Sequence, residues 1–151
     1  MSVLVKTSDP RVAPALPLIE ASHALMQSLF SPDACHQLAV DKLAAPSVTF
    51  CIAEQDGRAV GCAALARKGT YGEIKSMFVD PAARGSGAAT ALMQHLEALA
   101  RSDGLDVLKL ETGVPLTAAH ALYARCGFEE CGPFGDYVAH PDSVFMAKPL
   151  G

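Results

Sequence analysis

The segment at residues 77–89, MFVDPAARGSGAA, constrains the fold more than any other part of this chain. An apolar run typical of a strand stops at Asp80-Pro81, a short turn with two glycines follows, and an amphipathic helix begins at once. This order directs several backbone N–H groups and a helix N-terminus toward one point, where unpaired amides and the helix dipole favour a phosphate. The segment therefore predicts a strand–turn–helix unit that binds a ligand with a diphosphate.

Composition limits the classes of protein to which the chain can belong. Its 151 residues predict one domain, and a content of 50% apolar and 19% charged residues is typical of globular proteins. A formal charge of −4 without a basic stripe argues against a nucleic-acid partner. No apolar run is long enough for a membrane span, and the N-terminus lacks the layout of a secretory signal. Five cysteines without CxxC or zinc-like spacing predict reduced thiols, no metal site and a cytoplasmic location.

The spacing of apolar residues and turn formers predicts one mixed α/β domain over residues 1–151. The Asp56-Gly57 dipeptide between two apolar runs predicts a β-hairpin. Strands are predicted at about 3–7, 48–54, 58–66, 71–79, 105–111, 128–131 and 143–148. Helices are predicted at about 13–30, 86–101 and 117–126, and a further one extends from the break at 31–33 to about 43. The element order is thus βααβββαβαββ.

The third strand of the central meander alternates imperfectly. Glu73 and Lys75 fall on the same side as Met77 and Val79 in a regular strand, although two of the four are charged. A phase slip near Ser76 predicts a β-bulge. Backbone amides released by such a bulge could bind a carbonyl oxygen on which negative charge develops.

Two motifs make the chain resemble the GNAT superfamily of acyl-CoA-dependent N-acyltransferases over nearly its whole length. Residues 84–89, RGSGAA, fit the family's Arg/Gln-x-x-Gly-x-Gly/Ala motif, and residues 121–128, ALYARCGF, look like its Leu-Tyr-x-x-x-Gly-Phe segment. The resemblance implies an α/β (α+β) fold with a mixed, mostly antiparallel sheet of about seven strands and about four helices. Two central parallel strands would splay apart and admit the pantetheine arm of acetyl-CoA, the implied cosubstrate. Homodimers are common among proteins that resemble this chain.

The same resemblance assigns roles to individual residues. Tyr123 would hand a proton to the departing thiolate, since a phenol can do so when the two touch. Glu73 matches a position where several family members keep a catalytic carboxylate, and it would act through water or with a raised pKa. The alternative is an exposed strand carboxylate paired with Lys75 or Lys109. Leu116 and Thr117 stand where Asn or Gln is frequent, which puts one cofactor contact in doubt. The residues expected at the cofactor are Met77, Phe78, Val79, Arg84, Gly85, Ser86, Gly87, Ala88 and Ala89.

The acceptor side is predicted from a carboxylate and a loop. Glu111 ends the next strand and is a second candidate for the base or for a group that binds an amine. Phe134, Asp136 and Tyr137 lie in a turn-rich loop that, in this fold, resembles the acceptor wall. Together these features predict direct transfer of an acetyl group to the primary amine of a small molecule. A non-catalytic acyl-CoA sensor is an alternative, and so is a protein lysine or N-terminal acetyltransferase, although the chain has no long insertion to dock a peptide.

Overall fold

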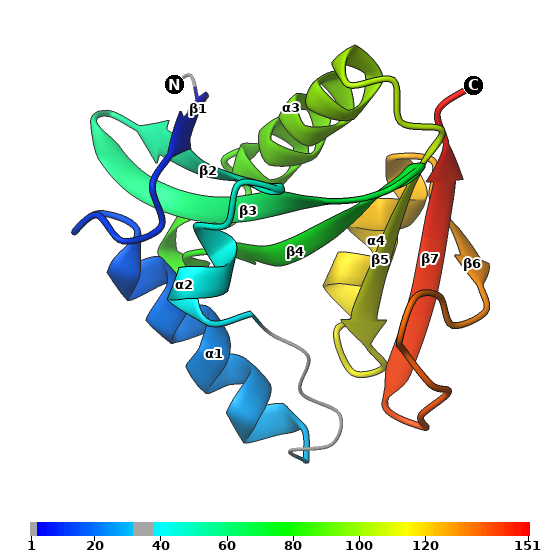
Figure 1. The fold of residues 1–151 in the computed structure, drawn as a ribbon. Coiled ribbons are helices and arrows are strands. Elements are labelled where there is room, and N and C mark those ends of the chain that lie inside the picture. Colours follow the sequence, from blue (N-terminus) through cyan, green and yellow to red (C-terminus); the bar gives the residue numbers. More distant parts are fainter. Residues whose placement is uncertain (1–2, 32–37) are drawn as a thin grey trace.

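The computed structural model of the chain describes residues 3–31 and 38–151. In this part, seven strands form one sheet in the order β1-β2-β3-β4-β5-β7-β6 (Figure 1). The strands are β1 (Val3–Ser8), β2 (Val48–Gln55), β3 (Arg58–Lys68), β4 (Tyr71–Val79), β5 (Val107–Gly113), β6 (Glu129–Cys131) and β7 (Ser143–Pro149). The helices are α1 (Leu16–Leu29), α2 (Val40–Leu43), α3 (Ala88–Ser102) and α4 (Thr117–Arg125), with a 3₁₀ turn η2 (Pro81–Ala83). The predicted fold class and element order are confirmed.

The first four strands form an antiparallel meander. The hairpin between β2 and β3 turns at Asp56 and Gly57, with φ of 53° and 79°. Two successive positive φ values match the twist of the flanking strands, which is why an Asp-Gly pair predicts this turn. Of the pairings in the described sheet, only the one between β4 and β5 is parallel.

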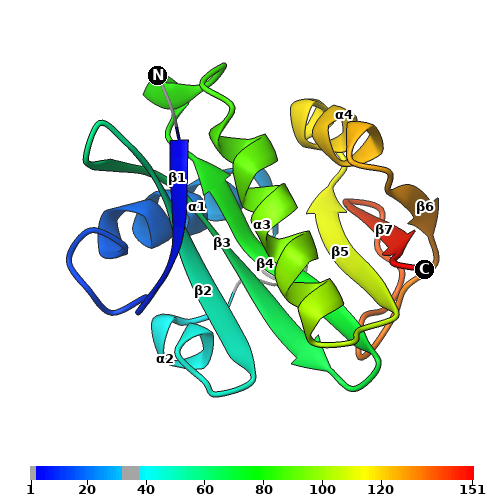
Figure 2. The ribbon, with the colours of Figure 1, turned by 90° about the horizontal axis from the view of Figure 1, so that it is seen from above.

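Helices cover both faces of the sheet. Helix α3 packs on β1 to β4, and Figure 2 shows it lying across the strands on this face. Helices α1 and α2 lie on the opposite face (Figure 1), where α1 contacts β3 and β4 and α2 contacts β2. Two apolar clusters result. The larger one joins Leu92 and Leu96 of α3 to the sheet, and the smaller one joins Leu18 and Ile19 of α1 to Phe50.

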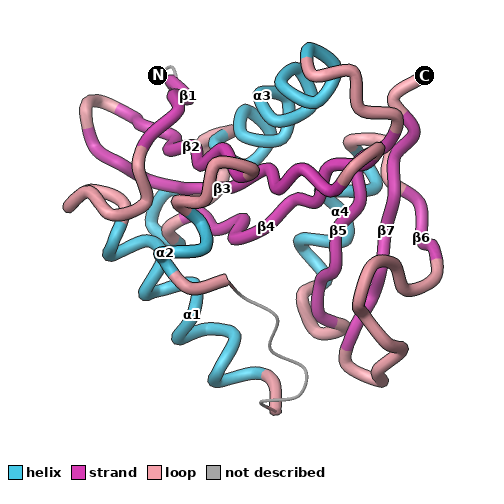
Figure 3. Tube along the Cα trace, in the orientation of Figure 1, coloured by secondary structure: helices cyan, strands magenta, loops and turns pink. Residues whose placement is uncertain are grey.

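The two parallel strands are paired over only part of their length. Residues Tyr71–Ile74 of β4 oppose Val107–Leu110 of β5, and past this ladder the strands diverge (Figures 1 and 3). From Lys75 onward, the side of β4 that faces β5 has no strand partner among the described residues. Its backbone N–H and C=O groups are therefore available to another extended molecule.

The predicted β-bulge is present in β4. The register with β3 pairs Ala64 with Lys75 but Cys62 with Phe78, so two residues of β4 oppose one residue of β3. Ser76 has a φ of 55°, which is uncommon for a residue with a side chain. The Cys62 thiol donates to the Ser76 carbonyl at 3.3 Å on this face of the bulge. The sequence alternation therefore located the slip correctly.

Helix α1 differs from its prediction. It begins at Leu16, because Pro17 is accommodated only in the first turn of a helix. Leu29, which helical spacing places on one apolar stripe with Leu25 and Met26, is 43% exposed. The second predicted helix is described as helix only at α2, and residues 32–37 lie outside the described part. No helix in the described chain is long and apolar enough to cross a membrane.

Candidate active site

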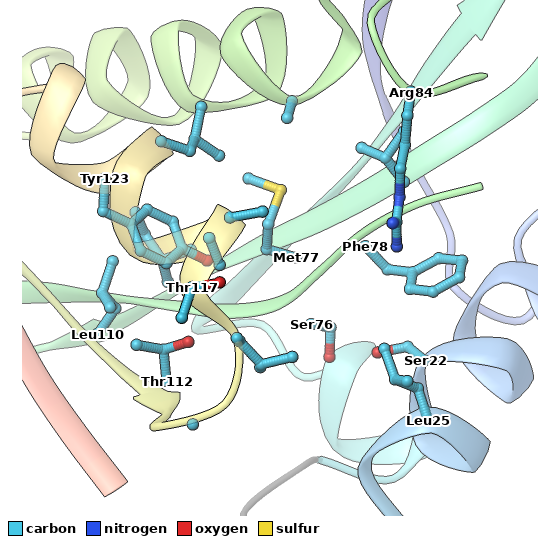
Figure 4. A pocket seen from close by; sticks show the side chains of 18 of the residues that line it. Ser22, Leu25, Ser76, Met77, Phe78, Arg84, Leu110, Thr112, Thr117 and Tyr123 are labelled. Atoms are coloured by element: carbon cyan, nitrogen blue, oxygen red, sulfur yellow. The ribbon is translucent and has the colours of Figure 1, made fainter. Parts of the chain in front are cut away.

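A cavity of about 640 Å³ opens where β4 and β5 part. One wall is α1, and the other is formed by the turn before α3, the start of α3, and α4 (Figure 4). Eight of the nine residues predicted at the cofactor line it: Met77, Phe78, Val79, Arg84, Gly85, Gly87, Ala88 and Ala89. The ninth, Ser86, instead accepts the Ala88 amide on its hydroxyl at 3.3 Å. The strand–turn–helix segment thus faces one hollow.

Several amides at the start of α3 lack an acceptor in the part of the chain that the structure describes. The first helical hydrogen bond is from Ala91 to Gly87, at 3.0 Å. Among the described residues, no acceptor pairs with the amides of Gly85, Gly87, Ala89 or Thr90. A Cβ built at either glycine would meet no heavy atom within 4 Å, so space remains directly over these donors. Unpaired amides, a helix N-terminus and open space fit a diphosphate.

The turn is fixed by a capping carboxylate. Asp80 accepts the Ala82 amide on Oδ1 at 2.9 Å, and its Oδ2 lies 3.0 Å from Arg58 Nη2. The Asp80 amide donates to Val60 on β3 at 2.8 Å. These bonds hold η2 against the end of β3 and thereby set the position from which Arg84 reaches the cavity (Figure 4).

The residues present therefore fit coenzyme A as a ligand. The unpaired amides of Gly85, Gly87, Ala89 and Thr90 would hold the diphosphate, with Arg84 as a counter-charge. The unpaired edge of β4 at Phe78 and Val79 offers backbone partners to an extended chain with amides, in the manner of an added strand.

Tyr123 is a buried residue of the cavity wall. It lies on α4, is 6% exposed, and packs against Phe128 with ring centroids 6.0 Å apart. Burial raises the pKa of its phenol well above the ordinary value, so the group keeps its proton. Its hydroxyl has no hydrogen-bond partner among the described residues, and Figure 4 shows it pointing toward Thr117 and Met77. The proton is thus available to a group inside the cavity.

Leu116 and Thr117, the departures from the family pattern, both line the cavity. Thr117 is the first residue of α4, and Figure 4 shows its hydroxyl beside that of Tyr123. A polar group is therefore still present at this position, although it is smaller than the frequent amide.

Glu73 belongs to a buried ion cluster and is not among the residues that line the cavity. Its Oε2 lies 3.4 Å from Lys75 Nζ and accepts a hydrogen bond from the Tyr137 hydroxyl. Lys75 in turn donates to the Tyr137 oxygen at 2.8 Å. The side chains of Glu73 and Lys75 are 6% and 10% exposed, respectively. The pairing with Lys75 that the sequence allowed is present, but it is buried and not exposed, and it contacts Tyr137 of the loop.

Glu111 does line the cavity, on β5 just past the last residue paired with β4. Burial raises the pKa of this carboxyl, and the Ser143 hydroxyl and the Lys75 charge act in the opposite direction. Of the two carboxylates proposed from the sequence, Glu111 is the one placed to touch a molecule in the hollow.

The three loop residues predicted for the acceptor wall lie outside the lining of this cavity. Phe134 is buried in an aromatic cluster, with its ring centroid 5.7 Å from that of Tyr71 and 5.8 Å from that of Phe145. Asp136 is exposed, and Tyr137 faces the ion cluster. None of these three loop residues is among the residues that line the cavity. The loop packs on the sheet because its aromatic side chains bury their apolar surface there.

Helix α1 supplies the wall that the sequence did not reveal: Ser22, Leu25, Met26 and Phe30. Figure 4 shows Ser22 and Ser76 facing each other across this half of the cavity. The Phe30 ring rests on Gly113 of β5, where a Cβ would lie 2.0 Å from a ring carbon. An apolar helical stripe predicts burial, but it does not distinguish a core from a cavity wall.

Known proteins are similar to this chain over nearly all of its length. A model described as "Acetyltransferase (GNAT) family" matches residues 19–128. The IAA acetyltransferase of Azospirillum brasilense is 40% identical over 151 residues, which cover 99% of each chain. The aminoglycoside N(6′)-acetyltransferase type 1 of Stenotrophomonas maltophilia is 29% identical over 82% of this chain and 88% of that one.

Solved structures agree with the sequence comparison. A crystal structure of a Klebsiella pneumoniae protein, described as an acyl-CoA N-acyltransferase, superposes with a TM-score of 0.83 at 34% identity. The match covers 99% of this chain and 98% of that one, so the whole described fold is shared.

Proposed function

The chain belongs to the acetyltransferase (GNAT) family, and from this premise we propose that it transfers the acetyl group of acetyl-CoA directly to the primary amine of a small molecule. Family membership makes it an acyltransferase that uses acetyl-CoA. The chemical class of the acceptor, the direct route and the roles of single residues are the proposed part.

One observation supports this proposal above all. A single cavity joins the unpaired amides at the start of α3, the Tyr123 hydroxyl and the Glu111 carboxyl. These are the three functions that the reaction requires, namely a diphosphate cradle, a proton donor and an anionic group for the amine.

Acetyl-CoA, when bound, supplies the acetyl group as a thioester. Tyr123 holds a proton at Oη and can donate it to a departing sulfur. Glu111 accepts a hydrogen bond from the amine and, as a carboxylate, can take up its proton.

The function is tested by thiol release from acetyl-CoA with a panel of acceptors. The panel holds simple amines, amino acids, a polyamine, an aminoglycoside, IAA and a short peptide with a free N-terminus. Thiol release with a small amine, together with the N-acetyl product in a mass spectrum, supports the proposal. Release with the peptide alone would favour a protein acetyltransferase, and release with none of the amines would contradict direct amine acetylation.

Acetyl-CoA is expected to raise the melting temperature of the protein. A ligand present at 100 times its Kd stabilises the folded state by about 2.7 kcal/mol. For a chain of this length, that corresponds to a rise of roughly 5–10 °C in thermal unfolding. Acetyl-pantetheine, which lacks the diphosphate, is the control and is expected to give a much smaller shift. An unchanged melting temperature at millimolar acetyl-CoA would count against the cradle at α3.

A further inference from the structure

Two charged residues stand at the fork between the central strands. The described charged residues that line the cavity are Lys75, Arg84, Glu111 and Arg125. The two arginines come from the turn before α3 and from α4, on the cofactor side. Lys75 and Glu111 follow directly on the last paired residues of β4 and β5. We call the part of the cavity between α1 and the fork of β4 and β5 the acceptor half. Its electrostatics depend on Lys75 and Glu111 and on the groups that face them.

The charge of Lys75 is already balanced. Its ammonium lies 3.4 Å from a Glu73 carboxylate oxygen and 2.8 Å from the Tyr137 oxygen, and Tyr137 donates to that same carboxylate. Both side chains are about nine-tenths buried, and two opposite charges in contact offset part of each other's cost of burial. Glu73 and Lys75, taken as a pair, thus carry no net charge.

Glu111 is not balanced in the same way. Among the described residues, no lysine, arginine or histidine lies within ion-pair distance of its carboxylate. Ser76, which also lines the cavity, has a buried Oγ with no hydrogen-bond partner in the described part of the chain. Among the described residues of this half, Glu111 is thus the carboxylate without an ion-pair partner, and it suits a single ammonium group.

The rest of this half is apolar. Leu25 and Met26 project from α1, and Phe30 closes the space by resting on Gly113. The body of a molecule whose ammonium reaches Glu111 would contact these side chains, and burial of apolar surface there favours a hydrocarbon or aromatic body.

From this arrangement we infer that the acceptor is a primary amine with one positive charge on an apolar body, carrying neither a carboxylate nor a second ammonium. The inference rests on the proposed amine acetylation and narrows its substrate class. A carboxylate on the acceptor would lie near Glu111 and Glu73 with Lys75 already paired. A second ammonium would enter an apolar space that has no second unbalanced carboxylate in the described part.

The experiment compares ligands that differ by one charge. Phenylalaninol and phenylalanine share one aromatic body, and pentylamine and 1,5-diaminopentane share one alkyl chain. The kcat/KM of the monocation in each pair is expected to exceed that of its partner by at least about tenfold, because like charges placed together in an interface are strongly disfavoured. Calorimetric binding to the CoA complex of the protein is expected to give the same order.

Charge variants supply the matched control. Lys75→Met leaves Glu73 without its counter-charge, so binding of 1,5-diaminopentane relative to pentylamine is expected to improve by at least about tenfold. The double variant Glu73→Gln/Lys75→Met removes both charges and restores the net charge of the native cavity, so the native preference should return. Should the single variant fail to fold, Glu111→Gln serves instead, and its binding preference between phenylalaninol and phenylalanine should fall to within about threefold.

The results separate this inference from the proposed function. If amines are acetylated but phenylalanine or 1,5-diaminopentane is used as well as its partner, the charge inference is overturned and amine acetylation stands. If no amine releases thiol, the proposed amine acetylation is contradicted. The order of the binding affinities measured by calorimetry then decides the charge inference. Tighter binding of both monocations supports it, and equal binding overturns it.

Discussion

Tyr123→Phe is expected to lower the rate of acetyl transfer by about two to four orders of magnitude, the usual contribution of a positioned general acid, while the affinity for acetyl-CoA stays nearly unchanged. The substitution removes one hydroxyl and keeps the ring that packs on Phe128. Because that hydroxyl has no described hydrogen-bond partner, no buried group loses its bond, and stability should change little. The rate is best measured as thiol release in a single turnover, so that product release does not hide the chemical step.

The matched control for this variant is Tyr71→Phe. Tyr71 makes an edge-on ring contact with Phe134 and is not among the residues that line the cavity, so the same loss of a hydroxyl should leave the single-turnover rate within about threefold of the native one. An unchanged rate in the Tyr123 variant would remove this phenol as the acid. Equal losses in both variants would indicate a general effect on the protein rather than a proton donated at Oη.

The local parts of the fold could be predicted from the sequence because each depends on neighbouring residues. β4 has the predicted bounds, Tyr71–Val79, and its bulge lies at the residue where charged and apolar positions change phase. The proposed phosphate cradle likewise lies within one segment, since Asp80 and the glycines act on amides only a few positions away. Turn chemistry and capping are encoded over such short distances.

The acceptor half could not be predicted, because its parts meet only in the folded chain. The hydrogen bonds that join Tyr137 to Lys75 and Glu73 span 62 and 64 residues, respectively. In the sequence, Glu73 resembles either a catalytic carboxylate or an exposed strand residue, and only the position of the loop shows that it is a buried partner of Lys75. The spacing of apolar residues indicates which side of an element is apolar, but it does not indicate what that side contacts in the folded protein.

The same limit explains α1 and the aromatic loop. Leu25 and Leu29 fall on one stripe in the sequence, yet one borders the cavity and the other is largely exposed. The sequence predicts Phe134 at the border of the acceptor, whereas in the structure its ring packs against three aromatic neighbours. A side chain that fills a core and one that lines a binding site have the same composition, so the enclosed volume has to be known before they can be told apart.

Gly87→Val is expected to abolish measurable binding of acetyl-CoA, with a loss of affinity of at least about a hundredfold, because a side chain would displace a phosphate from its charge-assisted hydrogen bonds. Gly87 precedes α3, has a φ of 88°, and contributes one of the unpaired amides. A Cβ at this position meets no protein atom within 4 Å, so a branched side chain would extend into the space above the donors. Binding is measured by calorimetry and by the acetyl-CoA-dependent shift in melting temperature.

The left-handed backbone at Gly87 requires a control, because valine is strained there whether or not a ligand binds, at a cost of about 1–3 kcal/mol. Gly69 provides it, with a φ of 78°, no heavy atom within 4 Å of a built Cβ, and a place in the turn at the opposite end of β4. Gly69→Val should therefore lose similar stability and keep its affinity for acetyl-CoA. Retained binding in the Gly87 variant would refute the cradle, whereas loss in both variants would assign the effect to strain. If only the Gly87 variant loses affinity for acetyl-CoA, the cause is the side chain that fills the space above the α3 amides.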